Sequence, residues 1–240
     1  GKARETHQFQ NNYHATYAIG QLNQYTFDAE YIAELDQGFD FYAPQTFSGL
    51  ENKENTILLG WIGLPDLTYP TNQFKWHSAL TMPREIQLKN NQLFQRPIKK
   101  IYENMTALSS LTLKGKMEVE HLDRAYLKFD AQNRPFTLDF FSNKAKEKLS
   151  LSYENGLICL DRHQSTQTEL MIKFGSQRYC SVHELHTIEI FFDRSIVEIF
   201  LNNGEKTMTS RFFIVDRENV IVTNRSLNIE VGFPKHIQYV

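Results

Sequence analysis

The 240-residue sequence is poor in cysteine, in proline and in tryptophan. Its two cysteines, Cys159 and Cys180, are separated by 20 residues. That spacing matches neither a zinc site nor a disulfide framework. We therefore expect two free thiols, which fits a reducing cytoplasm.

The chain also lacks an excess of charge of either sign. It contains 26 Lys plus Arg and 28 Asp plus Glu. No basic surplus is present to neutralise nucleic-acid phosphates or to hold an anionic membrane. Its apolar runs are far shorter than the roughly 20 residues that cross a bilayer. We therefore expect a soluble protein with no nucleic acid and no membrane among its partners.

Signatures of metal and cofactor sites are missing as well. The eight histidines include no His-x-x-x-His pair and no cysteine or carboxylate set at ligand spacing. No glycine-rich phosphate loop occurs, and Ser195 lacks the Gly-x-Ser-x-Gly elbow of a hydrolytic serine. We predict no metal, no cofactor and no serine triad.

Short runs of aromatic and β-branched residues, broken by Asn, Gly, Asp and Pro, recur about every ten residues and predict an all-β protein. The turn residues Asn203 and Gly204 predict a hairpin between residues 195–201 and 206–213. Near Pro97 the pattern changes to lysine pairs and a mildly helical stretch, residues 101–108. We place a junction at about 97–110, between modules of residues 1–103 and 104–240. The expected strands are 13–19, 39–47, 56–62, 78–88, 92–94, 125–130, 136–141, 149–153, 156–160, 169–174, 187–192, 195–201, 207–213 and 226–233.

The segment 34–47, Glu-Leu-Asp-Gln-Gly-Phe-Asp-Phe-Tyr-Ala-Pro-Gln-Thr-Phe, combines carboxylates, an amide and aromatic rings. This chemistry suits a polyhydroxylated ligand. The segment resembles the sugar-binding strand of glycoside hydrolase family 32, which contains invertases and sucrose-6-phosphate hydrolases. Residues 60–66, 69–71 and 76–85 follow in the order and approximate spacing of that family, and residues 192–200 resemble the signature of its C-terminal sandwich.

Three strings that carry catalysis in that family are absent: Asn-Asp-Pro-Asn-Gly, Arg-Asp-Pro and Glu-Cys. The resemblance therefore implies the C-terminal half of an enzyme, with all catalytic residues expected upstream. It also implies the last two or so blades of a five-bladed β-propeller, followed by a β-sandwich. We expect this chain alone to be inactive. Its uncovered propeller face predicts poor solubility or a partner, the N-terminal half of the same propeller.

The resemblance assigns substrate binding to Asp36, Asp40, Tyr42, Gln45 and Trp61. A retaining glycosidase needs two carboxyl groups about 5 to 5.5 Å apart. Asp36 and Asp40 would lie roughly 13 Å apart on a regular strand, so we expect them to hold sugar hydroxyls. They are alternatively solvated loop acids, and Trp61 is alternatively a core residue.

Residues 84–85, Arg-Glu, are expected to form a structural ion pair. Lys75, His77 and Arg84 are candidates for contact with a phosphate group.

The resemblance implies hydrolysis of the β-fructofuranosidic bond of sucrose 6-phosphate or sucrose, with retention, and a small-molecule fructoside as ligand. Two alternatives remain open. One is a carbohydrate-binding module without catalysis. The other is a structural role in which the sandwich forms a homodimer.

Overall fold

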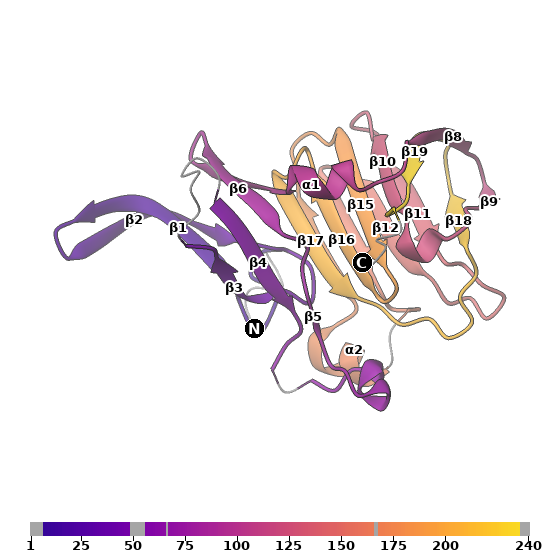
Figure 1. Ribbon diagram of the computed structural model, residues 1–240, viewed down its shortest axis with the longest axis horizontal. Helices are drawn as coiled ribbons and strands as arrows, with labels where there is room; N and C mark the ends of the chain where they lie inside the picture. The colour runs from indigo at the N-terminus through magenta and orange to yellow at the C-terminus, as the bar shows by residue number, and fades with distance from the viewer. Residues whose placement is uncertain (1–6, 49–55, 66, 166–167, 236–240) are drawn as a thin grey trace, which may run out of the picture.

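The structure is a computed structural model that describes residues 7–48, 56–65, 67–165 and 168–235. The ribbon is built almost wholly of strands, so the predicted all-β class is confirmed (Figure 1). The strands form a two-stranded hairpin, one smaller sheet and two six-stranded sheets. No helix in these ranges is long and apolar enough to cross a membrane.

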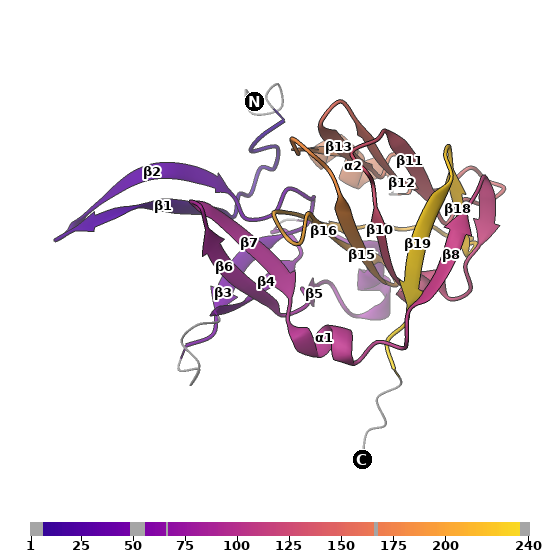
Figure 2. The ribbon, with the colours of Figure 1, turned by 90° about the horizontal axis from the view of Figure 1, so that it is seen from above.

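The first module contains the hairpin and the smaller sheet. The hairpin strands are β1 (Thr16–Asn23) and β2 (Thr26–Glu34), and they reach away from the rest of the molecule (Figures 1 and 2). The smaller sheet has the antiparallel order β3-β4-β6-β7, with β5 paired to β4. Its strands are β3 (Tyr42–Thr46), β4 (Thr56–Ile62), β5 (Ala79–Leu80), β6 (Arg84–Lys89) and β7 (Gln92–Pro97), with a 3₁₀ turn η2 at Pro70–Phe74.

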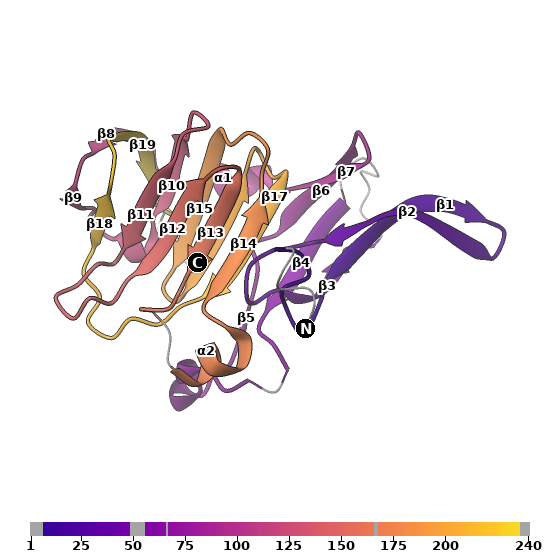
Figure 3. The ribbon, with the colours of Figure 1, turned by 180° about the vertical axis from the view of Figure 1, so that it is seen from behind.

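The second module is a two-layer sandwich, seen from behind in Figure 3. One sheet has the order β17-β16-β15-β10-β19-β8, and the other β14-β13-β12-β11-β18-β9. Alternate residues of strands such as Phe136–Phe140 are buried in one shared core. The strands are β8 (Ser109–Leu113), β9 (Lys116–Glu118), β10 (Tyr126–Asp130), β11 (Phe136–Phe140), β12 (Leu149–Glu154), β13 (Leu157–Asp161), β14 (Gln177–Ser181), β15 (Thr187–Asp193), β16 (Ile196–Leu201), β17 (Lys206–Arg211), β18 (Val220–Thr223) and β19 (Leu227–Gly232), with a 3₁₀ turn η3 at Leu122–Arg124.

The predicted hairpin is confirmed, because β16 pairs with β17. Its loop is longer than the expected two-residue turn, since the last cross-strand partners are Leu201 and Lys206. Three loop residues, Asn202, Asn203 and Gly204, have positive φ. The predicted two-residue primed turn is therefore shorter than the observed loop.

Three expected strands differ from the structure. The expected strand 78–88 is divided into β5 and β6, and residues 81–83 between them belong to neither. Residues 169–174 belong to helix α2 (Thr168–Phe174), so the predicted strand there is wrong. The expected strand 39–47 begins only at Tyr42, because the backbone of residues 37–40 bonds to β17 of the other module. Strands β2, β8, β9, β14 and β18 had no predicted counterpart.

Helix α1 (Lys99–Glu103) lies between the last strand of the first module and the first strand of the sandwich. Tyr102 in α1 meets Tyr126 and Phe191 of the sandwich edge-on, with ring centroids 6.0 Å apart in each case. The chain passes between modules at this helix. The module boundary at 103/104 itself stays a prediction.

Candidate functional site: an aromatic wall and the acidic segment beside it

Residues 34–41, here called the acidic segment, lie along β17, the edge strand of a sandwich sheet. The amides of Gln37 and Phe39 donate to the carbonyls of Thr207 and Thr209, each at 2.8 Å. At Gly38 the two backbones approach so closely that a Cβ would lie 2.1 Å from the Thr209 carbonyl oxygen. Only glycine fits this approach, so the sequence Gln-Gly-Phe places the segment as an added strand on the sandwich.

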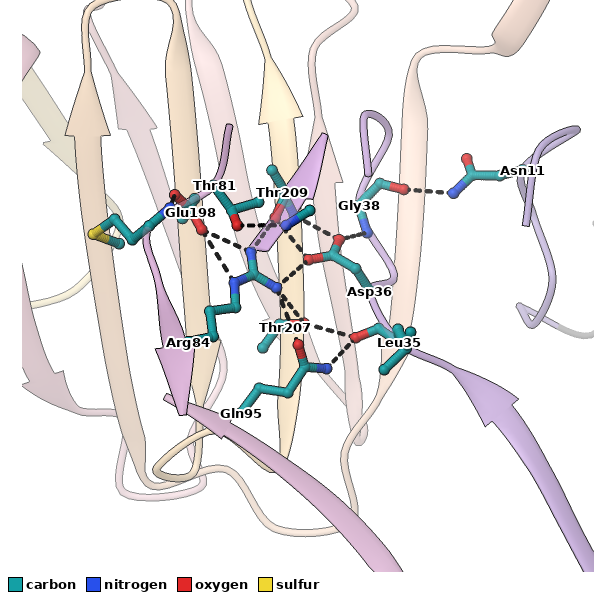
Figure 4. A network of polar contacts seen from close by, with 12 residues as sticks. Asn11, Leu35, Asp36, Gly38, Thr81, Arg84, Gln95, Glu198, Thr207 and Thr209 are labelled. Carbon is teal, nitrogen blue, oxygen red and sulfur yellow. Dashed lines mark hydrogen bonds and ion pairs between the residues drawn. The ribbon is translucent and has the colours of Figure 1, made fainter. Parts of the chain in front are cut away.

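Asp36 belongs to the polar network around the Arg84 guanidinium in Figure 4. Its Oδ2 pairs with Arg84 Nη1 at 3.1 Å, and its Oδ1 accepts from the Thr209 amide at 2.8 Å. Arg84 also pairs with Glu198 at 2.7 Å, and all three side chains are almost fully buried. The guanidinium therefore bridges a carboxylate from each module.

Burial and charge act in opposite directions on this trio. Burial alone lowers the pKa of Arg84, but the Glu198 and Asp36 carboxylates more than offset it, so the net pKa is raised. Burial raises the pKa of Glu198, and Arg84 only partly offsets that change. Arg84 therefore stays charged and is held between its two partners.

Asp40 is fully buried and both of its oxygens are occupied. Its Oδ2 accepts from Arg162 Nη1 at 2.9 Å and from the Arg211 amide at 2.8 Å. Its Oδ1 accepts from the Tyr69 hydroxyl at 2.6 Å. The neighbouring Phe39 belongs to the sandwich core, with the Arg162 guanidinium 3.7 Å from its ring centroid.

The structure thus gives Asp36 and Asp40 a different role from the expected sugar contact, because neither carboxylate is open to a ligand. The alternative of solvated loop acids is also wrong for both. The expected Arg84–Glu85 pair is wrong too: Arg84 bonds Asp36 and Glu198. Arg84 is equally excluded as a phosphate contact, since its side chain has no exposed surface.

Four aromatic side chains at the end of the smaller sheet form what we call the aromatic wall: Tyr13, Tyr42, Trp61 and His77. Tyr42 and Trp61 are cross-strand partners with ring centroids 6.4 Å apart. His77 stacks on Trp61 at 6.2 Å, and Tyr13 meets Tyr42 edge-on at 5.6 Å. Tyr42 and Trp61 are half-buried, so Trp61 is not a pure core residue.

Local backbone geometry determines where the side chains of the aromatic wall lie. At Gly63 a Cβ would lie 2.7 Å from Cε2 of the Trp61 indole, so this glycine leaves room for the ring. Ala43 has a positive φ, and the β3–β4 register shifts between Tyr42 and Gln45. Gln45 is exposed on the same strand as Tyr42. The bulge therefore fixes the position of the Gln45 amide relative to the Tyr42 ring along β3.

The acidic segment supports the wall through a buried tyrosine. Tyr69 donates to Asp40 and meets His77 edge-on at 5.1 Å, and His77 Nε2 donates to the Leu67 carbonyl at 2.7 Å. Burial, with Asp40 beside it, raises the pKa of the Tyr69 hydroxyl, which therefore remains a donor. Asp40 thereby acts through Tyr69 on His77, which stacks on Trp61.

Of the five expected substrate-binding residues, the structure brings Tyr42 and Trp61 together, places the exposed Gln45 opposite Leu59 further along β3, and sets Asp36 and Asp40 apart in the module interface. Sequence reasoning did not place Tyr13 in the site, and it considered His77 only as a phosphate contact. No spacing rule links either residue to Trp61, because the contacts join distant parts of the chain. Lys75 is exposed at the end of η2, two residues before His77 in the sequence.

This arrangement provides binding groups. Aromatic faces pack against apolar faces of ligands, and an exposed amide both donates and accepts hydrogen bonds. The two expected acids cannot act as nucleophile or proton donor while both are held in buried ion pairs. Among the described residues no group of three or more His, Cys, Asp or Glu side chains is placed to hold a metal ion.

Comparison with known proteins gives a consistent result. The family model described as "Glycosyl hydrolases family 32 N-terminal domain" matches residues 2–97, and "Glycosyl hydrolases family 32 C terminal" matches residues 90–231.

A sucrose-6-phosphate hydrolase of Streptococcus mutans serotype c is 34% identical over 197 residues, which are 81% of this chain and 40% of the relative. One from Staphylococcus xylosus is 32% identical over 242 residues, with 92% and 46% covered. The solved sucrose-6-phosphate hydrolase from Lactobacillus gasseri superposes with a TM-score of 0.82 at 25% identity, covering 95% of this chain and 49% of that one. The chain spans less than half the length of these relatives.

Proposed function

Because the chain belongs to glycosyl hydrolase family 32, we propose that it is the C-terminal part of a retaining β-fructofuranosidase, acting on sucrose 6-phosphate or sucrose. The observation that carries this proposal is the aromatic wall, whose rings offer packing faces to a sugar, with the exposed Gln45 on the same strand as Tyr42. The N-terminal half would supply the nucleophile, the stabilising aspartate and the acid/base glutamate.

In this proposal Tyr42, Gln45 and Trp61 contact the fructoside. The two rings present faces to the sugar's C–H groups, and Gln45 bonds hydroxyls. Asp36 and Asp40 act as positioning residues, because they fix the segment that precedes β3 and, through Tyr69, the wall.

The N-terminal half of the same propeller is the proposed partner. The hairpin β1–β2 has unusually exposed apolar side chains: Leu22 is 71% exposed, and Tyr25 fully. A hairpin that pairs with no third strand is marginal in water, and exposed strand edges attract further strands. Blades from the missing half would cover these groups and complete a five-bladed propeller.

The preference for a phosphorylated substrate is supported by the names of the relatives, by His77 in the aromatic wall and by Lys75, which precedes His77 by two residues in the sequence. Arg84 is not a candidate. A cytoplasmic location is supported by the free thiols Cys159 and Cys180. The proposed modules are residues 1–103 and 104–240.

The test is glucose or glucose 6-phosphate release from sucrose and sucrose 6-phosphate, by the chain alone and with a separately produced N-terminal half. We expect turnover only with both halves, and a Trp61→Ala chain should give a reconstituted rate at least tenfold lower. Turnover by the 240 residues alone would contradict the assignment of catalysis to the other half.

The two alternatives predict other outcomes. Fructoside binding without turnover by the reconstituted protein would favour a carbohydrate-binding module. A dimer of the chain that neither binds nor turns over sugar would favour the structural role. Both would overturn the proposed hydrolysis.

A further inference from the structure

A second concave site lies where the two modules meet, apart from the aromatic wall. It is an open trough of about 790 Å³. One side is formed by Tyr31 of the hairpin and by Asn90 and Gln92 at the β6–β7 turn. The other side is formed by Asn155 at the β12–β13 turn and by His183 after β14. No residue of the aromatic wall lines it.

The lining chemistry indicates the class of ligand. Carboxamides donate and accept hydrogen bonds at once, as do hydroxyl groups, so Asn90, Gln92 and Asn155 match a polyhydroxylated molecule. Tyr31 is 42% exposed and adds an aromatic face, which packs against the apolar face of a sugar ring.

Charge indicates a neutral ligand. The acidic and basic side chains of the trough, Glu205 and Lys206, are adjacent in the chain, and Asn202 Nδ2 donates to Glu205 Oε2 at 2.8 Å. No cluster of cations is present to hold a phosphate or an acidic polymer. The volume is within the usual range of ligand sites, about 300–1,000 Å³.

Turn geometry accounts for some of the asparagines. Asn90 and Asn155 have positive φ, which asparagine tolerates in hairpin turns. It does not account for Gln92, which has ordinary strand geometry in β7 and donates to the Glu205 carbonyl at 3.5 Å. Nor does it account for the exposed His183.

A separate small hollow shares two lining residues with the trough. Glu205 and Lys206 also line a small hollow of about 10 Å³, together with Gln37. Among the described residues, the buried Gln37 Oε1 has no hydrogen-bond partner. Buried acceptors are normally satisfied, and a hollow of this size holds about one hydroxyl or water. A hydrogen-bond donor in this hollow would satisfy the Gln37 Oε1 acceptor.

We propose that the trough binds a neutral oligosaccharide, with Tyr31 as the stacking face and Gln92 and Asn155 as hydroxyl contacts. The site takes several sugar units, because it is open and joins both modules. It does not depend on the proposed hydrolysis, since none of its residues belongs to the aromatic wall.

The test is isothermal titration calorimetry on the 240-residue chain with two neutral probes, nystose and cellotetraose, and one anionic probe, trigalacturonate. We expect binding of at least one neutral probe and none of the anionic one. Tyr31→Ala should weaken binding about tenfold, as for loss of a stacking ring. Gln92→Ala is a second variant that tests the trough without altering the β1–β2 hairpin.

Two control variants locate the binding. Tyr25→Ala removes a fully exposed tyrosine of the same hairpin and should leave affinity unchanged. Trp61→Ala should leave the affinity for cellotetraose unchanged, because that probe contains no fructosyl unit for the aromatic wall to contact. No heat from either neutral probe would overturn the proposal. Weakening by Trp61→Ala but not by Tyr31→Ala would overturn it too, while supporting sugar binding at the aromatic wall.

Discussion

At the scale of single residues, Arg84 shows how a buried charge joins two modules. Its guanidinium contacts Asp36 from the first module and Glu198 from β16 of the sandwich, and it lies 5.1 Å from the ring centroids of Phe41 and Phe200. Replacing a buried ion network by apolar groups can be neutral, but removing one partner leaves uncompensated charge. Arg84 is therefore critical because two acids depend on it.

Arg84→Ala should lower the free energy of unfolding by about 3–5 kcal/mol, since it leaves Asp36 and Glu198 buried without a counter-ion. Urea unfolding followed by tryptophan fluorescence measures the change. The matched control is Arg96→Ala, an exposed arginine of the same sheet, with an expected change within about 0.5 kcal/mol. Equal effects of the two variants would show that the buried network contributes nothing specific.

Cys180 makes a pH-dependent contribution to stability. Burial raises the pKa of its thiol from 9.0 to about 12, and nearby Lys206 acts in the opposite direction. The folded chain therefore holds this proton more tightly than the unfolded chain. This contribution is complete below about pH 9 and is lost as the pH rises toward 12.

We expect the free energy of unfolding of the native chain to fall relative to Cys180→Ala between pH 9 and pH 11. The variant lacks the titrating group, and other groups cancel in the comparison. Urea titrations of both proteins at each pH give the difference. Parallel curves over this range would rule out the contribution.

At the scale of elements, the acidic segment was both the most informative stretch of sequence and the one whose role the sequence misplaced. Its composition correctly marked the family. Alternating carboxylates and rings look like a ligand strand, but the same residues suit an added strand with buried arginine partners. Those partners, Arg84, Arg162 and Arg211, lie tens to hundreds of positions away, so no local pattern could pair them.

Gly38→Ala should lower the free energy of unfolding by about 2–4 kcal/mol, because the new Cβ would overlap the Thr209 backbone, which cannot move away like a flexible side chain. Thermal or urea unfolding measures the loss. Gly115→Ala is the control: this glycine has φ of +61° but nothing within 4 Å, so only about 1 kcal/mol of backbone strain is expected. A loss at Gly38 no larger than at Gly115 would contradict the tight docking.

At the scale of the whole molecule, strand recurrence predicted the all-β class and the sandwich, because alternating burial appears directly in the sequence. Strands β2, β8, β9, β14 and β18 were missed, and the residues of β2 are mostly exposed and carry no such alternation. The wall was predicted in part: Tyr42 and Trp61 follow from the motif, whereas His77 and Tyr13 join through contacts between distant segments.

The two modules share one core, although their boundary is a natural division of the sequence. Phe39 of the first module is fully buried in the sandwich cluster, between the guanidinium groups of Arg162 and Arg178. With the backbone bonds to β17 and the buried ion pairs Arg84–Glu198 and Asp40–Arg162, this contact predicts that neither module unfolds without the other. The acidic segment thus joins the modules and, through Asp40, holds the wall.

Two intrinsic probes test this claim most directly. Trp61 and Trp76, the only tryptophans, report the first module, and Cys180 reports the sandwich in a Cys159→Ala background. Urea unfolding at pH 8 is followed by tryptophan fluorescence and by labelling of Cys180 with Ellman's reagent. We predict one shared midpoint, which Phe39→Ala lowers equally for both probes. Tryptophan fluorescence that changes while Cys180 stays protected would contradict the shared core.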